Sequence, residues 1–265
     1  MRELKFGVEI EFFGVSYQTV IDKLREAGIE VRDFNGYTHE VMYEWKVTTD
    51  SSVNWRGTGQ NAGLELVSPI LYDDEGLEEL EKVYEVLNEI GAKVDKSCGT
   101  HVHFDVADYS IENMISFINL WYNNKNVINY LVPESRRHNE YCTQIYRHDI
   151  DEINEKYNRG VIRGIRDIAW VIGTRYKTIN LNSYVKYGTV EIRQHGGTTE
   201  FSKMEAWIVM IYQMLEVAKS NKVNTIKALR STPNNFNKFL KEINLDDSCI
   251  GDFLTDRFNH FKGVA

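Results

Sequence analysis

Four short segments of this chain alternate apolar residues with residues that can bind cations or anions. They are residues 6–12, 101–106, 179–182 and 190–193. Successive side chains of a β-strand point to opposite faces, so each segment predicts a strand with one apolar and one polar face. Because the apolar face must be buried, we expect the polar side chains of each strand to lie on the face opposite to the core.

The identity of the polar residues separates this pattern from an ordinary amphipathic sheet. A solvated face would carry mainly Lys, Thr and Ser, and it remains the alternative for any single strand. Here the polar positions hold mainly Glu, His, Asn and Arg, which bind cations or orient anions. They are Glu9, Glu11, His101, His103, Asp105, Asn180, Asn182, Glu191 and Arg193. Repetition over four strands favours a ligand-binding face.

The spacing of these residues indicates the kind of ligand. Glu9 and Glu11 lie about 7 Å apart on one strand face, which suits a hard divalent cation with oxygen ligands. Without a cation or a proton between them, the two carboxylates would repel each other. His101 and His103 also share a face, although a zinc site would need a third close ligand. Because carboxylates are many and cysteines are scattered, Mg²⁺ or Mn²⁺ fits better than structural zinc.

Composition narrows the class of protein. Of the 265 residues, 42% are apolar and 26% are charged, which are globular values. A net charge of −8 argues against sequence-independent binding to nucleic acid. No apolar stretch is long enough to span a membrane, and the N-terminus lacks the apolar core of a secretory signal. Three cysteines at scattered spacings favour a reducing compartment, so we expect a cytoplasmic protein.

Strands and helices are mixed without a strict βαβ rhythm, which predicts an α+β fold. The expected strands are 4–13 and 101–106, with two hairpins formed by 41–49 with 63–70 and by 176–184 with 189–195. The expected helices are 16–27, 73–91, 110–131 and 199–218, followed by two or three short helices. We expect residues 1–220 to form one domain, with 221–265 as a helical extension of it.

Four further residues have two interpretations each. Glu65 stands inside an apolar run, where an edge-strand position facing solvent is an equal alternative to a ligand role. Asp50 ends a strand, and a turn or capping role is its simpler explanation. Arg136 and Arg137 could clamp a phosphate or lie in a solvated loop.

Two other features favour a structural explanation. Cys98 would need a base and an activated thiolate to act as a nucleophile. The glycine-rich residues 57–63 fit a hairpin tip better than a phosphate cradle, since the chain has no P-loop pattern.

Six short motifs follow one another in a characteristic order. They are FGVEIE at 6–11, ELVSP at 65–69, CGTHVH at 98–103, PESR at 133–136, NLN at 180–182 and EIRQH at 191–195. Together they resemble the amidoligase family, a branch of the carboxylate–amine ligases related to glutamine synthetase and glutamate–cysteine ligase. The resemblance covers about residues 3–200. The ordered set is fairly specific, although no single motif is.

The resemblance implies a glutamine-synthetase-type fold, in which a curved, mainly antiparallel sheet has helices on its convex face and ATP with divalent cations on its concave face. It implies five metal ligands, namely Glu9, Glu11, Glu65, His101 and Glu191. It also implies a place for His103 near the nucleotide phosphates, to which we add Asn180 and Asn182, and a charge-stabilising role for Arg193. The ammonium-binding elements and subunit contacts of glutamine synthetase cannot be matched, so substrate and oligomeric state do not follow.

We therefore expect an ATP-dependent ligase that forms an amide or peptide bond through an acyl phosphate. Its substrates would be small-molecule or peptide carboxylates and amines. Arg193, and less directly Arg136, would stabilise negative charge, and Asp50 is our candidate for the base that deprotonates the amine. A metal-dependent hydrolase that activates water on the same face and a nucleotide-binding module without turnover are the alternatives. ATP consumption that requires both an amine and a carboxylate would discriminate between them.

Overall fold

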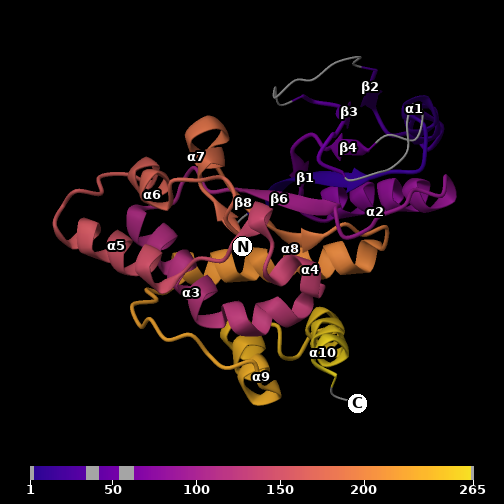
Figure 1. Cartoon of the computed structure of the whole chain (residues 1–265). Coiled ribbons are helices and arrows are strands. Elements are labelled where there is room, and N and C mark those ends of the chain that lie inside the picture. The colour runs from indigo at the N-terminus through magenta and orange to yellow at the C-terminus, as the bar shows by residue number, and fades with distance from the viewer. Residues whose placement is uncertain (1–2, 34–41, 54–62, 264–265) are drawn as a thin grey trace. The chain divides into compact units, whose positions relative to one another are not determined.

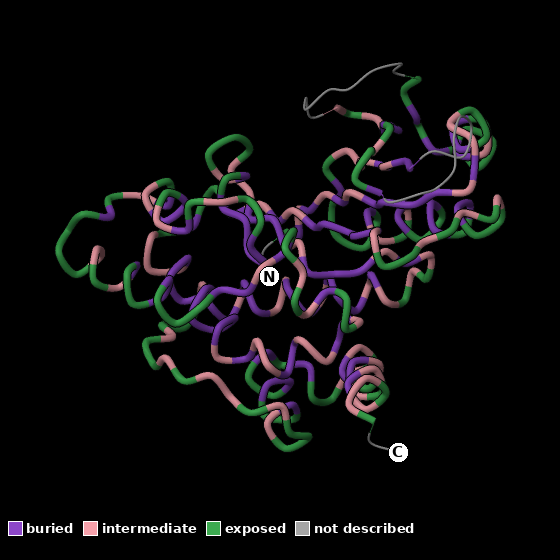
Figure 2. The backbone as a smooth tube through the Cα atoms, viewed as in Figure 1, coloured by how far each residue is buried: buried purple, intermediate pink, exposed green. Residues whose placement is uncertain are grey.

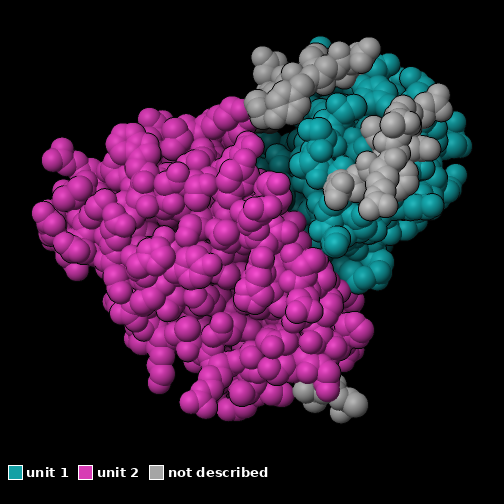
Figure 3. Space-filling view, viewed as in Figure 1, with its two compact units in different colours: residues 1–104, 195–205 teal, residues 105–194, 206–265 magenta. Residues whose placement is uncertain are grey.

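The computed structural model describes residues 3–33, 42–53 and 63–263. The chain forms two compact units, which Figure 3 distinguishes by colour. The first comprises residues 1–104 and 195–205, and the second comprises residues 105–194 and 206–265. Because residues 195–205 return to the first unit, neither unit is one continuous stretch of chain. Figure 1 labels the helices and strands of both.

The first unit contains a mainly antiparallel sheet. Its strands, in spatial order, are β2 (Val31–Arg32), β3 (Trp45–Thr49), β4 (Leu64–Val67), β1 (Lys5–Phe12) and β6 (Gly99–Asp105), and β5 (Leu71–Tyr72) also pairs with β1. The β1 pairings with β4, β5 and β6 and the β3–β4 hairpin are antiparallel, whereas β2 and β3 are parallel. The predicted strands at the N-terminus and after residue 100, and the predicted first hairpin, are confirmed.

Strand β1 has two faces of opposite character, as its alternation predicts. One face is at most 2% exposed and consists of Phe6, Val8, Ile10 and Phe12. Glu9 and Glu11 alternate with these residues and point to the other face. Figure 2 colours the backbone by the burial of each residue. The burial of one face therefore decides the direction of both carboxylates.

The helices α1 (Tyr17–Glu26) and α2 (Asp73–Glu89) belong to the first unit and confirm the helices predicted there. The hydroxyl of Ser16 caps α1 by accepting a hydrogen bond from the backbone N–H of Thr19 at 3.1 Å. Helix α2 has three acidic residues in its first turn, which suit the positive end of the helix dipole. Helix α1 contacts β2, β3 and α2, and α2 contacts β5, so helices and sheet share one core.

The second unit is mainly helical. Its helices are α3 (Ile111–Ile128), α4 (Glu134–Arg137), α5 (Arg147–Asn158), α6 (Ile165–Ile172), α7 (Asn182–Tyr187), most of α8 (Phe201–Ser220), α9 (Pro233–Glu242) and α10 (Cys249–Lys262), with 3₁₀ turns η2 (Asn129–Leu131) and η3 (Glu140–Cys142). Trp121 of α3 meets Trp207 of α8 edge to face, with ring centroids 6.3 Å apart. Both rings are almost fully buried, and both predicted long helices are confirmed.

Two helices, α9 and α10, follow residue 220, which agrees with the predicted helical C-terminal segment. Phe236 of α9 stacks on Phe258 of α10, with ring centroids 4.4 Å apart. Both helices belong to the second unit, and a domain boundary at residue 220 stays a prediction. Across the described ranges, no helix is both long and apolar enough to cross a membrane.

The hairpin predicted from 176–184 and 189–195 is only partly present. Strand β7 (Ile179–Asn180) pairs antiparallel with β8 (Thr189–Gly196), but it is two residues long. The chain then enters helix α7, which ends at Tyr187 and is capped by Gly188 with a φ of 73°, a left-handed conformation that glycine adopts readily. Four alternating residues were too short a pattern to separate a strand from the start of a helix.

The apolar face of β1 gives a direct prediction for stability. Ile10 is fully buried, so Ile10→Ala should leave a cavity and lower the free energy of unfolding by about 2–5 kcal/mol. Ile70, in the same unit, is 51% exposed, and Ile70→Ala should change this free energy by less than about 0.5 kcal/mol. Urea unfolding measures both values. Equal effects of the two variants would contradict the position of Ile10 in the core.

Candidate functional site

A group of acidic side chains of the first unit lies on the face of the sheet opposite to the apolar residues of β1. The strand register pairs Glu9 with His101 of β6 and Glu11 with Glu65 of β4. Directly paired residues point to the same face of a sheet. Four of the five residues predicted as metal ligands are thereby brought together.

Glu9 lies between the two histidines of β6. Its Oε2 is 3.0 Å from Nδ1 of His101, and its Oε1 is 3.4 Å from Nε2 of His103. The other ring nitrogen of His101 is 3.8 Å from Oε1 of Glu11. His101 is only 5% exposed. One imidazole thus lies between two carboxylates that would otherwise repel each other.

Glu11 is oriented by the backbone of β6. The N–H of Gly99 donates a hydrogen bond of 2.6 Å to its Oε2, and the residue is 7% exposed. A carboxylate that accepts a backbone hydrogen bond has a fixed direction. Its other oxygen, Oε1, is the atom near His101.

Among the described residues of the first unit, two groups of three possible metal ligands are present. Glu9, Glu65 and His101 form one, and Glu11, Asp50 and Glu65 form the other, with ligand atoms within 4.8 Å of one another in each group. Glu65 is common to both. Asp50 also accepts a 2.7 Å hydrogen bond from the backbone N–H of Ser52. The turn role expected for Asp50 is therefore present, and its carboxylate also lies beside the other acids.

The electrostatics of this face are unbalanced. Burial alone would raise the pKa of Glu9, but the hydrogen bonds and charges of His101 and His103 hold it well below the usual carboxyl range. The pKa of Glu65 is raised well above that range, first by burial and then by the charges of Glu9, Asp50 and Glu11. The neighbouring negative charges therefore add to the effect of burial on the pKa of Glu65, the residue that both groups share.

The donor atoms of this face fit a hard divalent cation. Four carboxylates and one imidazole supply mainly oxygen ligands, which Mg²⁺ and Mn²⁺ prefer. A divalent cation would also supply the positive charge that would lower the raised pKa of Glu65. The face therefore meets both the chemical and the electrostatic requirements for binding such an ion.

In the second unit, Glu191 and Arg193 share a face of β8. Nδ2 of Asn180, on β7, donates a 2.5 Å hydrogen bond to Oε2 of Glu191, and Nη1 of Arg193 bonds to Oε1. Nε of Arg193 lies 3.4 Å from the carbonyl of Tyr141. Glu191 is 4% exposed. Both carboxylate oxygens are thus engaged by neighbours in the same unit, and the predicted shared face is present.

Two predicted arginines have structural contacts. Arg136 is buried, and its Nη2 donates a 2.6 Å hydrogen bond to the carbonyl of Arg193 on β8. Arg137 donates through Nε to the carbonyls of Asn129 and Val132, at 2.8 and 3.2 Å. Neither lies in a solvated loop, because both belong to the short helix α4. Their guanidinium groups connect α4 to β8 and to the end of α3.

Asn182 does not share a strand face with Asn180, and this part of the predicted polar face is wrong. It is exposed at the start of α7, and its backbone N–H donates a 2.9 Å hydrogen bond to Oδ1 of Asn180. The cause is the short length of β7. Asn180 alone remains beside Glu191.

Sequence reasoning missed two residues on the acidic face of the first unit. Lys46 and Thr48 of β3 are 6% and 3% exposed, and Oγ1 of Thr48 lies 3.4 Å from Oε2 of Glu65. The alternation of residues 45–48 was the available signal. It was overlooked because Lys and Thr are the residues expected on a solvated face.

The structural explanation holds for Cys98. Burial raises the pKa of its thiol to about 11, so the thiol stays protonated at neutral pH and is a poor nucleophile. Of the glycine-rich residues 57–63, all but Gly63 lie outside the described residues.

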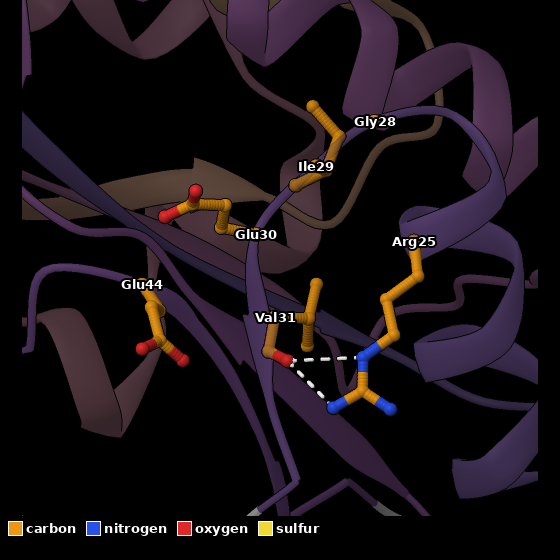
Figure 4. Close-up of a pocket in the computed structure, with 6 residues that line it drawn as sticks. All are labelled: Arg25, Gly28, Ile29, Glu30, Val31 and Glu44. Carbon is orange, nitrogen blue, oxygen red and sulfur yellow. Dashed lines mark hydrogen bonds between the residues drawn. The ribbon is translucent and has the colours of Figure 1, made fainter.

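A shallow pocket of about 500 Å³ lies elsewhere in the first unit, at the end of α1 (Figure 4). Arg25, Glu30 and Glu44 supply its charged groups. The guanidinium of Arg25 donates two hydrogen bonds to the carbonyl of Val31, at 3.2 and 2.9 Å, so it fixes the chain between α1 and β2. None of its lining residues belongs to the acidic face described above.

The raised pKa of Glu65 predicts a pH-dependent stability in EDTA. A carboxyl group whose pKa is raised by folding stabilises the fold at low pH, and this contribution is lost as the pH rises through the raised value. Glu65→Gln lacks this loss, so its unfolding free energy minus that of wild type should grow as the pH rises from the usual carboxyl range. The exposed Glu85→Gln, on α2, should show no such trend. Denaturant unfolding at several pH values measures the difference, and a flat difference for Glu65→Gln would contradict the crowding of acids.

Comparisons with solved structures and with models of protein families both give matches to this chain. A solved structure described as "Crystal structure of novel glutamine synthase homolog" matches 98% of this chain at 13% identity and a TM-score of 0.44, and this chain spans 66% of the length of that protein. No curated protein matches the chain. The model of the family described as "Putative amidoligase enzyme" matches residues 2–215. Since this match covers most of the sequence, the chain belongs to that amidoligase family.

Proposed function

We propose that this chain is an ATP-dependent ligase that joins a carboxylate to an amine and forms an amide or peptide bond. Family membership supports a ligase. The observation that carries the proposal is the pair of ligand groups that share Glu65 on one face of the sheet. Such a face suits phosphoryl transfer, because that reaction gathers negative charge that cations can offset.

The proposed reaction has two steps. First, a carboxylate oxygen of the substrate attacks the γ-phosphorus of ATP, the bond to the β–γ bridging oxygen breaks, and ADP leaves. The acyl phosphate is then attacked at its acyl carbon by the amine nitrogen, the bond from carbon to the phosphate oxygen breaks, and the nitrogen loses a proton. The products are an amide, ADP and phosphate.

In this proposal, the first unit holds the cations. Glu9, Glu11, Glu65 and His101 would be ligands of Mg²⁺ or Mn²⁺, which offset phosphate charge and align the phosphoryl group when bound. His101 keeps Glu9 in a fixed direction through their 3.0 Å contact, and the N–H of Gly99 does the same for Glu11. Hydrogen bonds of this kind orient metal ligands in advance.

We assign the remaining roles from the family likeness. Glu191 would be the fifth metal ligand, with Asn180 orienting it through their 2.5 Å hydrogen bond. Arg193 would stabilise negative charge that develops during transfer. His103 and Asn182 would contact the nucleotide, although the exposed position of Asn182 on α7 weakens its case.

Asp50 and Arg136 keep roles that are less direct. Asp50 is our candidate for the base that accepts the amine proton, although its place beside Glu11 and Glu65 also favours metal ligation. Arg136 is already bonded to the backbone of β8, so it would act mainly by holding that strand in place.

We propose small-molecule or peptide carboxylates and amines as substrates, and the cytoplasm as the location. The odd number of cysteines, at scattered positions, is compatible with a reducing compartment. The net charge of −8 remains our argument against a nucleic-acid partner.

ADP release should require a divalent cation and both substrates. A screen of carboxylate and amine libraries with ATP and Mg²⁺ or Mn²⁺ should find a pair that releases ADP, and EDTA should abolish the release. Glu11→Gln keeps an oxygen for the hydrogen bond from Gly99 but loses a charge, so the release rate should fall about a hundredfold or more, with little change in thermal midpoint. Cation-dependent turnover without ATP would favour a hydrolase, and nucleotide binding without release by any pair would favour a binding module.

Arg193→Lys should depress turnover more than stability. Lysine keeps the charge but loses the planar fork that grips two oxygens at once. A lost transition-state contact is worth roughly 2.7–4 kcal/mol, or about a hundred- to a thousandfold in rate. Arg137→Lys, which alters contacts to backbone carbonyls and to the rings of Tyr130 and Phe261 in the same unit, is the matched control and should keep its rate. Turnover and thermal midpoint are compared at saturating ATP and metal, and an unchanged rate for Arg193→Lys would remove that residue from the site.

A further inference from the structure

Lys46 lies in one row with two of the proposed metal ligands. It pairs with Val67 of β4, which pairs with Glu9 of β1, which in turn pairs with His101 of β6. Paired residues in neighbouring strands point to one face. The side chain of Lys46 therefore leaves the sheet on the face that carries the acidic groups.

The position of Lys46 is unusual for a lysine. Only 6% of the residue is exposed, and lysine is rarely buried unless its charge is offset. Thr48, its neighbour on the same face of β3, pairs directly with Glu65, so Lys46 is a diagonal neighbour of Glu65. The positive charge of Lys46 opposes the rise in the pKa of Glu65, so the two groups are close enough to interact.

The charges on this face show what metal binding would change. Glu9, Glu11, Asp50 and Glu65 bring four negative charges. With Glu65 ionised and both histidines neutral, one divalent cation for each of the two ligand groups would offset all four, and Lys46 would then leave the loaded face positive by about one charge. Two cations beside a buried ammonium group form a site for an anion with several oxygens.

We propose that Nζ of Lys46 binds an oxygen of the γ-phosphoryl group of ATP. This assignment rests on the proposed function, in which the cations of this face contact the β- and γ-phosphates. The γ-phosphoryl group has three non-bridging oxygens, one more than the β-phosphoryl group within ATP, and so can contact cations and an ammonium group together. The same contact would offset negative charge on the phosphoryl group as it moves to the substrate carboxylate.

Comparing the binding of ADP with that of an ATP analogue distinguishes a direct contact to the γ-phosphoryl group from a general role of Lys46 in balancing charge. The probes are the Mg²⁺ complexes of ADP and of an ATP analogue with a non-hydrolysable β–γ linkage, titrated calorimetrically into the full chain. Lys46→Met should weaken binding of the ATP analogue about ten- to a hundredfold, while the Kd for ADP should change less than about twofold. Lys46→Arg retains the charge and donors and should retain most of the affinity for the analogue.

Lys5→Met is the matched control. Lys5 is on the same face of β1 but four residues from Glu9, about 13 Å along the strand. It is more exposed and pairs with Glu3 at 3.2 Å. This variant should bind both nucleotides like wild type. Lys46→Gln repeats the test with a second neutral side chain, and thermal midpoints establish which variants are folded.

Three outcomes would overturn the assignment. Equal weakening of both nucleotides by the neutral variants would mean that Lys46 maintains the face rather than contacts the terminal group. Unchanged binding of both would mean that it holds another anion, such as the substrate carboxylate, or none. If wild type itself binds neither nucleotide in Mg²⁺, the proposed function fails and this assignment fails with it. That result differs from a failure confined to the Lys46 variants.

Discussion

The geometry of the first unit depends on the burial of one face of strand β1. Its four apolar side chains are nearly inaccessible, and each contributes about 1.5–3 kcal/mol by leaving water. Because side chains alternate, this burial also decides where Glu9 and Glu11 point. The register with the neighbouring strands then adds His101 and Glu65 to the same face. A slip of one residue would send the carboxylates into the core, so the site and the fold depend on one register.

The fold gathers acids on this face, and the charges that offset them are distributed unevenly. Glu9 has two histidines beside it, and its pKa is well below the usual range. Glu65 faces Glu9, Asp50 and Glu11, with the charge of Lys46 acting against them, and its pKa is raised. Crowding of this kind is unfavourable in a protein that binds nothing, and it becomes favourable when cations bind. We infer that the crowded carboxylates lower the stability of the protein without ligands and favour the binding of cations.

Features that depend on residues close together in the sequence could be predicted, whereas features that depend on the pairing of distant segments could not. The faces of β1 and β6, the helices α1, α2, α3 and α8 and the α+β class follow from periodicity, which is a local property. The approach of Glu65 to Glu11 depends on strand pairing, which the alternation alone leaves open. The start of α7 at Asn182 was missed because four residues cannot fix a period. Lys46 was missed because its residue type suggests solvent, whereas its burial follows from the packed sheet.

Asp50 reaches the acidic face through close packing that has no periodic signature. Three residues after it, Val53 packs with Phe13 and Cys98 in a small apolar cluster. The backbone N–H of Asp50 bonds to the carbonyl of Gly63 at 2.9 Å. A Cβ at Gly63 would lie 2.5 Å from the carbonyl oxygen of Asp50 and from Cβ of Val53, so no larger residue fits there without a shift. A glycine and a buried thiol that look unrelated to chemistry therefore determine where this carboxylate stands.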